Sequence, residues 1–246
     1  MTPTDLKVKI FADGAAKKGM LELYNNPLIT GFTTNPTLMC KEGISDYQAF
    51  AMDILSTIKD YPISFEVFSD DFDEMQRQAL LIASWGSNVY VKIPVTNTLG
   101  EPSYDLISQL ASMGVKQNVT ALMTLSQTEE VTKALAHGPS AFISIFAGRI
   151  ADTGRDPMPL MREALNIMQP HSQLELIWAS PRELLNIFQA DEIGCHIITV
   201  TNDVLKKLAL VGKNLDEYSL ETVKMFRDDA VKAGFNLGTA DVEKVA

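Results

Sequence analysis

The sequence predicts a parallel (β/α)8 barrel, formed as one domain over residues 1–246 and closed by an additional C-terminal helix. Short apolar, β-branched runs alternate with longer amphipathic stretches, which is typical of strands followed by helices. Eight such units fit into 246 residues, a length at which α/β barrels are single domains. Each predicted strand also brings polar residues to its carboxyl end, where barrel enzymes place their active sites.

The apolar runs give the strands, of which the second and fifth are the weakest. The predicted strands are 8–11, 29–32, 63–67, 89–93, 115–119, 141–146, 174–178 and 195–200. The predicted helices are 15–24, 47–58, 72–85, 103–113, 126–136, 159–168, 181–190 and 201–210, with a last helix over 220–233.

Local signals support several helix starts. Ser45 and Asp46 can cap the second helix, and Ser126 with Glu129 has the spacing of a capping box. Pro181 suits a first helical turn. The main alternative fold is a doubly wound open sheet, but the first strand ends in Asp-Gly-Ala-Ala at residues 13–16, without a glycine-rich phosphate loop.

Composition and charge exclude several classes of function. The net charge of −10 argues against a nucleic-acid partner, because phosphate backbones require a positive surface. No apolar run approaches the ~20 residues of a membrane span, which argues against a membrane partner. Cys40 and Cys195 lie far apart, as expected of reduced thiols, and the N-terminus lacks a signal-peptide pattern. We therefore expect a cytoplasmic protein.

Lys92 is the strongest candidate for a catalytic residue. It interrupts the apolar fourth strand, and parallel strands are buried on both faces. Burial disfavours the charged form of a lysine, and the neutral amine is a nucleophile. The alternative is a strand-end lysine that reaches water or makes a structural ion pair.

Two acids also lie at predicted strand ends. Glu66, in the third strand, is a candidate general acid or base, or else a structural partner of Lys92. Asp13, at the end of the first strand, could act in acid–base chemistry, cap the following helix, or do both.

The late strands suggest a phosphate site. Arg149 and Arg182 follow the sixth and seventh strands, and Ser180 precedes a predicted helix start. Two arginines and a helix N-terminus can hold a phosphate against the global negative charge, although a single arginine would usually be a surface charge. The histidines His137, His171 and His196 match no metal-ligand spacing, so we predict no metal site.

Five segments together resemble the transaldolase family. They are Thr-Thr-Asn-Pro-Thr-Leu at 33–38, Val-Lys-Ile-Pro at 91–94, Asn-Val-Thr at 118–120, Phe-Ala-Gly-Arg-Ile-Ala-Asp at 146–152 and Ala-Ser-Pro-Arg at 179–182. They run in order over most of the chain.

The resemblance implies a cofactor-free enzyme that transfers a dihydroxyacetone unit between sugar phosphates, as in the pentose phosphate pathway. It implies that Lys92 forms a Schiff base with the ketose and that Asp13 removes the hydroxyl proton that starts carbon–carbon cleavage. Glu66 and Thr120 would hold a water for proton transfer. The residues implied in ordering the site or binding hydroxyls are Thr33, Asn35, Asn118, Ser144 and Phe146, and those implied in the phosphate clamp are Arg149, Ser180 and Arg182.

Related activities remain open. Glu66 and Phe146 resemble the transaldolase branch, whereas the smaller fructose-6-phosphate aldolases carry Gln and Tyr; Pro181 departs from an expected aromatic. An aldolase that releases free dihydroxyacetone and a non-catalytic sugar-phosphate-binding barrel are the alternatives. The last helix, with Met225 and Phe226, could pack on the barrel or on a neighbouring copy in a homo-oligomer.

Overall fold

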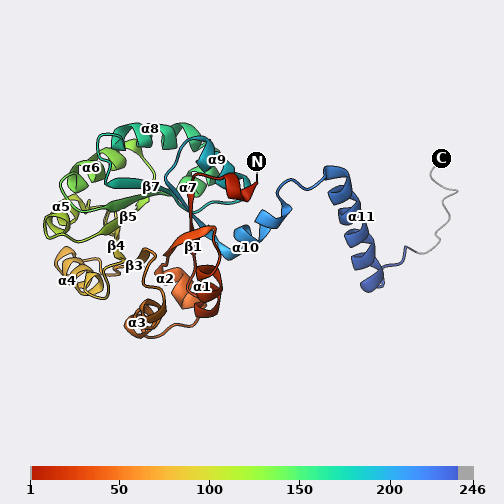
Figure 1. Cartoon of the computed structure of the whole chain (residues 1–246), viewed down its shortest axis with the longest axis horizontal. Coiled ribbons are helices and arrows are strands. Elements are labelled where there is room, and N and C mark those ends of the chain that lie inside the picture. Colours follow the sequence, from red (N-terminus) through yellow and green to blue (C-terminus); the bar gives the residue numbers. More distant parts are fainter. Residues whose placement is uncertain (1, 238–246) are drawn as a thin grey trace.

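The computed structural model of the chain describes residues 2–237. Eight parallel strands pair in sequence order and close into a barrel, with helices around it (Figure 1). The strands are β1 Lys9–Asp13, β2 Ile29–Thr33, β3 Ile63–Glu66, β4 Val89–Pro94, β5 Gln117–Leu122, β6 Ala141–Ile145, β7 Leu174–Trp178 and β8 Ile197–Thr201. The predicted (β/α)8 barrel with an additional C-terminal helix is confirmed.

Most helices follow the predicted alternation. The α-helices are α1 Lys17–Tyr24, α2 Pro36–Lys41, α3 Tyr47–Thr57, α4 Phe72–Ala83, α5 Tyr104–Ser112, α6 Leu125–Leu135, α7 Ala147–Asp152, α8 Met158–Met168, α9 Leu185–Glu192, α10 Asn202–Leu205 and α11 Leu215–Lys232. Two 3-10 segments, η1 Pro3–Asp5 and η2 Lys206–Leu210, complete the elements. The short helices α2 and α7, directly after β2 and β6, were not predicted.

Strand β5 begins two residues later than predicted because buried polar residues hide its apolar pattern. Gln117 and Asn118 are both fully buried within it. The Gln117 side-chain amide donates to the carbonyl oxygen of Ile107 at 2.9 Å, which anchors β5 to α5. The strand then bulges between Val119 and Leu122, where Ala121 takes a left-handed conformation with φ 67°.

Side-chain caps set the starts of α3, α6 and α11. Asp46 caps α3 as predicted, accepting from the Ala49 amide at 2.9 Å. The capping box of α6 is formed by Thr124 and Gln127, so the prediction for Ser126 and Glu129 was wrong by two residues. Helix α11 begins earlier than predicted because Asn214 caps it.

The prediction that Pro181 opens a helix was also wrong. The chain stays irregular after β7, and α9 begins only at Leu185. The amides of Arg182 and Glu183 both donate to the Asn186 side-chain oxygen, at 2.8 and 3.2 Å. Asn186 thus fixes an irregular loop where a first helical turn was expected.

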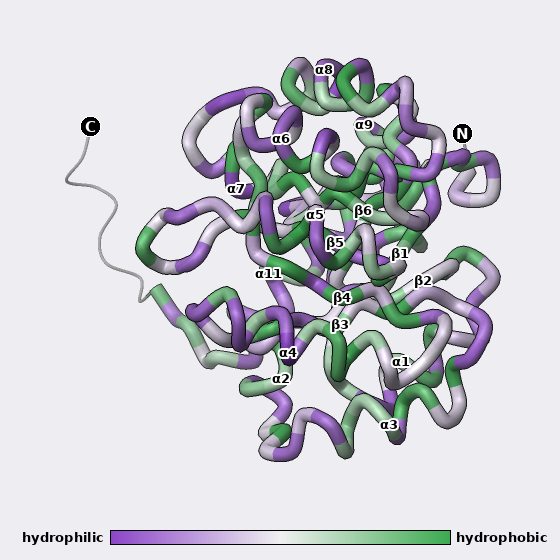
Figure 2. Tube along the Cα trace, turned by 90° about the vertical axis from the view of Figure 1, so that its left-hand side faces the viewer, coloured by the Kyte–Doolittle hydropathy of each residue, from purple (hydrophilic) through white to green (hydrophobic). Residues whose placement is uncertain are grey.

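A layer of aromatic side chains fills the barrel below the strand ends. Hydrophobic segments meet in the strands at the centre (Figure 2). Phe142 stacks on Tyr90 with ring centroids 4.0 Å apart and meets Phe11 edge-on at 5.6 Å. Gly31 makes room for Phe11, because a Cβ at residue 31 would lie 2.5 Å from that ring. Side chains two residues further along a strand share its inward face, so the next layer is polar.

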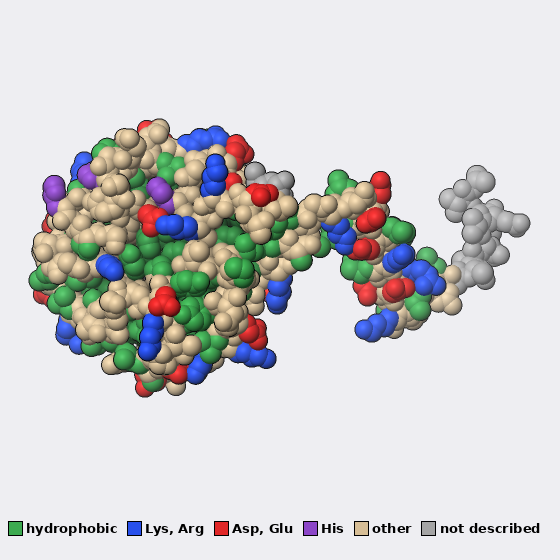
Figure 3. Space-filling view, viewed as in Figure 1, with side chains coloured by type: hydrophobic (Ala, Val, Ile, Leu, Met, Phe, Trp, Pro, Cys, Tyr) green, Lys and Arg blue, Asp and Glu red, His purple; other side chains and the backbone are tan. Residues whose placement is uncertain are grey.

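Helix α11 stands away from the barrel at the C-terminal end of the described chain (Figure 1). None of its residues is buried, although it carries several large apolar side chains among its charges (Figure 3). The exposed apolar residues of α11 are Leu215, Tyr218, Leu220, Val223, Met225, Phe226 and Val231.

Candidate active site

A cavity of about 480 Å³ opens at the carboxyl ends of the strands. It is lined by all of the predicted site residues except Asn118. These are Asp13, Thr33, Asn35, Glu66, Lys92, Thr120, Ser144, Phe146, Arg149, Ser180 and Arg182. A barrel brings these residues together because its parallel strands all end on one face.

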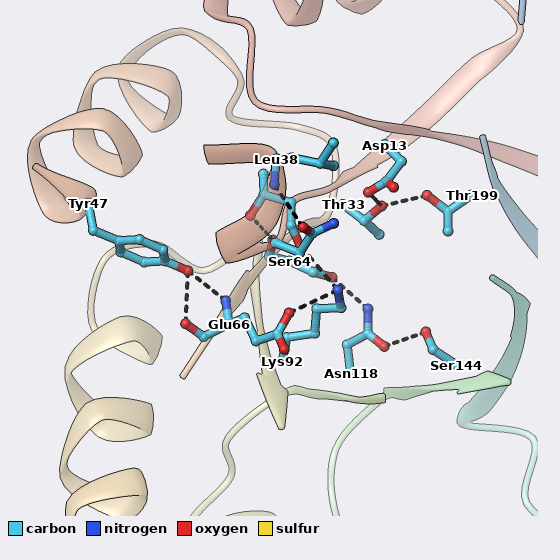
Figure 4. Close-up of polar contacts among 12 residues, drawn as sticks. Asp13, Thr33, Leu38, Tyr47, Ser64, Glu66, Lys92, Asn118, Ser144 and Thr199 are labelled. Atoms are coloured by element: carbon cyan, nitrogen blue, oxygen red, sulfur yellow. Dashed lines mark hydrogen bonds and ion pairs between the residues drawn. The ribbon is translucent and has the colours of Figure 1, made fainter. Parts of the chain in front are cut away.

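Lys92 lies in the cavity wall with only 6% of its surface exposed. Its Nζ is 3.1 Å from Oε2 of Glu66 and donates to the carbonyl oxygen of Thr34 at 3.2 Å (Figure 4). Glu66 and Lys92 are register partners on β3 and β4, so their side chains leave adjacent strands on the same side. The ion pair foreseen as one alternative is therefore present, and it faces the cavity.

Asp13 turns into the barrel instead of capping α1, whose N-cap is Ala16. Its Oδ1 accepts from the Thr33 hydroxyl at 2.7 Å, and Thr33 is hydrogen-bonded in turn to the Thr199 hydroxyl (Figure 4). Burial raises the pKa of Asp13, while the charge of Lys92 and the bond from Thr33 oppose that shift. A carboxyl group whose pKa is raised holds a proton more readily, which suits acid–base chemistry.

Asn118 supports the cavity wall without lining it. Its amide donates to Ser64 Oγ at 2.9 Å, and its Oδ1 accepts from Ser144 Oγ at 2.7 Å (Figure 4). This chain crosses from β3 through β5 to β6 inside the barrel and fixes the Ser144 hydroxyl. Asn118 therefore positions Ser144, whose side chain lines the cavity. Ser64 was missed, although it precedes Glu66 by two residues and so shares its face.

The buried Thr120 hydroxyl has no hydrogen-bond partner among residues 2–237. Such a group is costly when buried unless something else satisfies it. Thr120 lines the cavity next to the left-handed Ala121. Its hydroxyl is thus available to a molecule in the cavity.

Asn35 reaches the cavity as the N-cap of α2. Its Oδ1 accepts from the Leu38 amide at 2.9 Å, which fixes the side chain at the mouth of β2. Pro36, Thr37 and Leu38 of the same helix also line the cavity. They were not predicted as lining residues because α2 is too short to give a periodic pattern.

The two arginines lie on the side of the cavity formed by α7 and the β7–α9 loop. The Arg149 guanidinium lies 5.7 Å from the centre of the Phe146 ring. Arg182 binds the carboxylate of Asp152 through both Nε, at 3.0 Å, and Nη2. This pairing holds the pKa of Asp152 below its usual range.

The backbone at this side is tightly constrained. A Cβ on Gly148 would lie 1.6 Å from the carbonyl oxygen of Ser180, so only glycine fits. Ser180 itself is left-handed, with φ 59°. Non-glycine residues in this region carry strain of about 1–3 kcal/mol, which commonly persists at binding sites. The close approach of α7 to the β7–α9 loop sets the positions of Arg149 and Arg182.

Residues 2–237 contain neither a candidate metal-binding cluster nor a membrane-spanning helix. Across residues 2–237, no cluster of three His, Cys, Asp or Glu side chains could hold a metal ion. No helix in that same range is long and apolar enough to cross a bilayer.

Comparison with known proteins supports the resemblance. Residues 10–241 match the family model described as Transaldolase/Fructose-6-phosphate aldolase. A "Probable transaldolase" of Dehalococcoides mccartyi is 36% identical over 202 residues, which cover 82% of this chain and 90% of that relative. A "Probable transaldolase" of Thermoanaerobacter sp. is 32% identical over 231 residues, 94% of this chain and all of that relative.

Solved structures support the fold alone. The alpha subunit of tryptophan synthase from Campylobacter jejuni gives a TM-score of 0.54 at 14% identity, with 86% of this chain and 92% of that chain covered. The 3-keto-L-gulonate-6-phosphate decarboxylase from Vibrio cholerae gives 0.52 at 11% identity, with 80% and 88% covered.

Proposed function

This chain belongs to the Transaldolase/Fructose-6-phosphate aldolase family and is an enzyme of that type, and we propose that it is a transaldolase acting through a Schiff base on Lys92. The observation that carries the proposal is the nearly buried Lys92 amine, which faces a cavity and is paired with Glu66. A lysine with only a structural role would need neither a cavity beside it nor Asp13, the second acid that lines this cavity.

In the proposed reaction, Lys92 first gives a proton to Glu66, and its neutral amine then attacks the ketone carbon of fructose 6-phosphate or sedoheptulose 7-phosphate. The carbinolamine then loses water to give the imine. Glu66 and Thr120 carry out the proton transfers through a water molecule. The free Thr120 hydroxyl and the carboxylate 3.1 Å from Nζ support this assignment.

Carbon–carbon cleavage is assigned to Asp13. Its carboxylate takes the proton of the hydroxyl on the fourth carbon, and the bond between the third and fourth carbons breaks. The imine nitrogen is protonated at this stage, so the bonding electrons move onto the iminium to give a neutral enamine, and the aldose phosphate leaves as its aldehyde. The enamine then attacks an acceptor aldose phosphate, whose new alkoxide regains the proton from Asp13, and hydrolysis frees Lys92. The raised pKa of Asp13 suits this two-way proton transfer.

Substrate binding is assigned to the remaining predicted residues. Asn35, Thr33 and Ser144 offer polar groups for sugar hydroxyls, Asn118 orients Ser144, and Phe146 packs near Arg149. Arg149, Ser180 and Arg182 form the phosphate clamp, because arginine binds phosphate oxygens through two parallel hydrogen bonds. Sugar phosphates are thus the proposed substrates.

Borohydride reduction in the presence of fructose 6-phosphate tests the imine. We expect a covalent adduct on Lys92, identified by peptide mass spectrometry. Tight binding without any adduct would instead favour a non-catalytic sugar-phosphate-binding barrel.

Adding erythrose 4-phosphate separates transfer from simple aldol cleavage. A transaldolase should then form sedoheptulose 7-phosphate. Free dihydroxyacetone as the dominant product, with or without the acceptor, would identify the aldolase alternative.

We further propose that the protein is a homo-oligomer in which α11 packs on another copy. Helix α11 has 18 residues and none of its side chains is buried, so its apolar residues are exposed to water. An isolated helix is only marginally stable in water, and a large exposed apolar patch usually marks an interaction surface. Light scattering should therefore give an oligomer for the full chain and a smaller species for Phe226→Asp, whose circular dichroism should still show a folded barrel. A monomeric wild-type protein at micromolar concentration would contradict this proposal.

A further inference from the structure

The β2–β3 hydrogen-bond ladder breaks where the site begins. The Thr34 amide still donates to the Ser64 carbonyl at 3.1 Å. In a continuing parallel ladder, the carbonyl of Thr34 would next accept from the Glu66 amide. Instead, that carbonyl accepts from Lys92 Nζ at 3.2 Å. The break thus supplies one of the two partners of the Lys92 amine.

The break leaves the Glu66 amide and carbonyl without partners on β2, and the Tyr47 hydroxyl bonds to both groups. The hydroxyl accepts from the Glu66 amide at 2.7 Å and donates to the Glu66 carbonyl at 2.9 Å (Figure 4). A tyrosine hydroxyl can do both because it is donor and acceptor at once. A side chain from α3 therefore takes the place of strand β2 at this position.

The Tyr47 ring lies among aromatic side chains, while its hydroxyl is held by the two bonds to Glu66. The ring meets Phe65 edge-on with centroids 6.3 Å apart and lies 6.0 Å from the Trp85 ring. Burial raises the pKa of Tyr47, so the hydroxyl keeps its proton at any ordinary pH. Tyr47 does not line the cavity, so any effect on the chemistry must pass through Glu66.

We propose that Tyr47 is a positioning residue, which holds the Glu66 backbone and leaves the Thr34 carbonyl free for Lys92. This assignment rests on the proposed function, because it concerns the geometry of the reacting amine. Without the hydroxyl, the Glu66 amide would donate to the Thr34 carbonyl. Lys92 would then lose that carbonyl as an acceptor, and the Glu66 carboxylate would shift relative to the Lys92 amine.

Tyr47→Phe tests this assignment, since it removes one oxygen and keeps the packed ring. We expect kcat and the rate of borohydride trapping on Lys92 to fall about 10- to 100-fold, the range for misplacement near a reacting group. The KM for fructose 6-phosphate should stay near the wild-type value, because the phosphate and hydroxyl contacts are untouched.

Trp85→Phe is the matched control. It loosens the same aromatic cluster but keeps the Tyr47 hydroxyl, so we expect a lower Tm with wild-type trapping and kcat per folded molecule. Equal losses of rate in the two variants would reduce Tyr47 to a packing role and overturn the proposal.

The outcomes separate this inference from the proposed function. No adduct on Lys92 in the wild-type protein would overturn the Schiff-base function and this assignment with it. An adduct that forms equally fast in wild-type and Tyr47→Phe protein would overturn the assignment of Tyr47 alone. A crystal structure of Tyr47→Phe adds a readout besides activity. The Thr34 carbonyl should turn away from Lys92 and toward the Glu66 amide. An unchanged bond between Lys92 and the Thr34 carbonyl would overturn the positioning role of Tyr47.

Discussion

Lys92→Met is expected to lower kcat roughly 10⁴-fold or more, because removal of a covalent nucleophile leaves only binding and charge stabilisation. The fold should survive, since methionine fills a similar volume in the apolar strand β4. Glu66 loses its ionic partner, but its side chain faces the cavity and keeps access to solvent. Steady-state rates and circular dichroism check both expectations.

Lys92→Arg distinguishes catalysis from a structural ion pair. Arginine keeps a positive charge next to Glu66 but remains protonated and cannot form an imine. If Lys92 only paired with Glu66, this variant would retain much of its activity. Lys18→Met, which removes an exposed lysine outside the cavity, is the matched control and should behave as the wild type.

The fold could be predicted from the sequence because apolar periodicity reports burial. Parallel strands are buried on both faces and therefore appear as continuous apolar runs. The grouping of Lys92, Glu66 and Asp13 followed as well, because strand ends meet at one face of a barrel. The predicted bounds of strand β5 were shifted because Gln117 and Asn118 are polar yet fully buried. Gln117 bonds to Ile107 in the preceding helix, and Asn118 bonds to Ser64 and Ser144 on other strands, so the apolar pattern of β5 itself could not reveal these partners.

Other features depend on contacts that periodicity does not encode. Tyr47 looked like an ordinary first residue of a helix, and its link to Glu66 arises only when α3 packs beside β3. The pairing of Arg182 with Asp152 joins the β7–α9 loop to the end of helix α7, 30 residues earlier in the chain. Ser64 and Gly31 are different, because each lies two residues before a site residue and could have been found by extending the strand alternation.

The phosphate clamp yields the second large prediction. Arg182→Ala should raise the KM for fructose 6-phosphate about 10- to 100-fold, because a hydrogen bond to a charged group contributes about 1.5–3 kcal/mol. Arg149→Ala together with Arg182→Ala should raise it further, to roughly 10³-fold if the two contributions add. Steady-state kinetics with fructose 6-phosphate as the donor measure both effects.

Unphosphorylated fructose provides the internal comparison for that prediction. It lacks the group that the clamp binds, so kcat/KM for fructose should change little in Arg182→Ala. Arg155→Ala is the control variant, because Arg155 is exposed, contacts Thr153 and does not line the cavity. A loss of equal size for both sugars would mean that Arg182 acts mainly by holding Asp152 and the surrounding loop. The phosphate would then have to bind elsewhere on the cavity wall, with Arg149 as the remaining cation on that side.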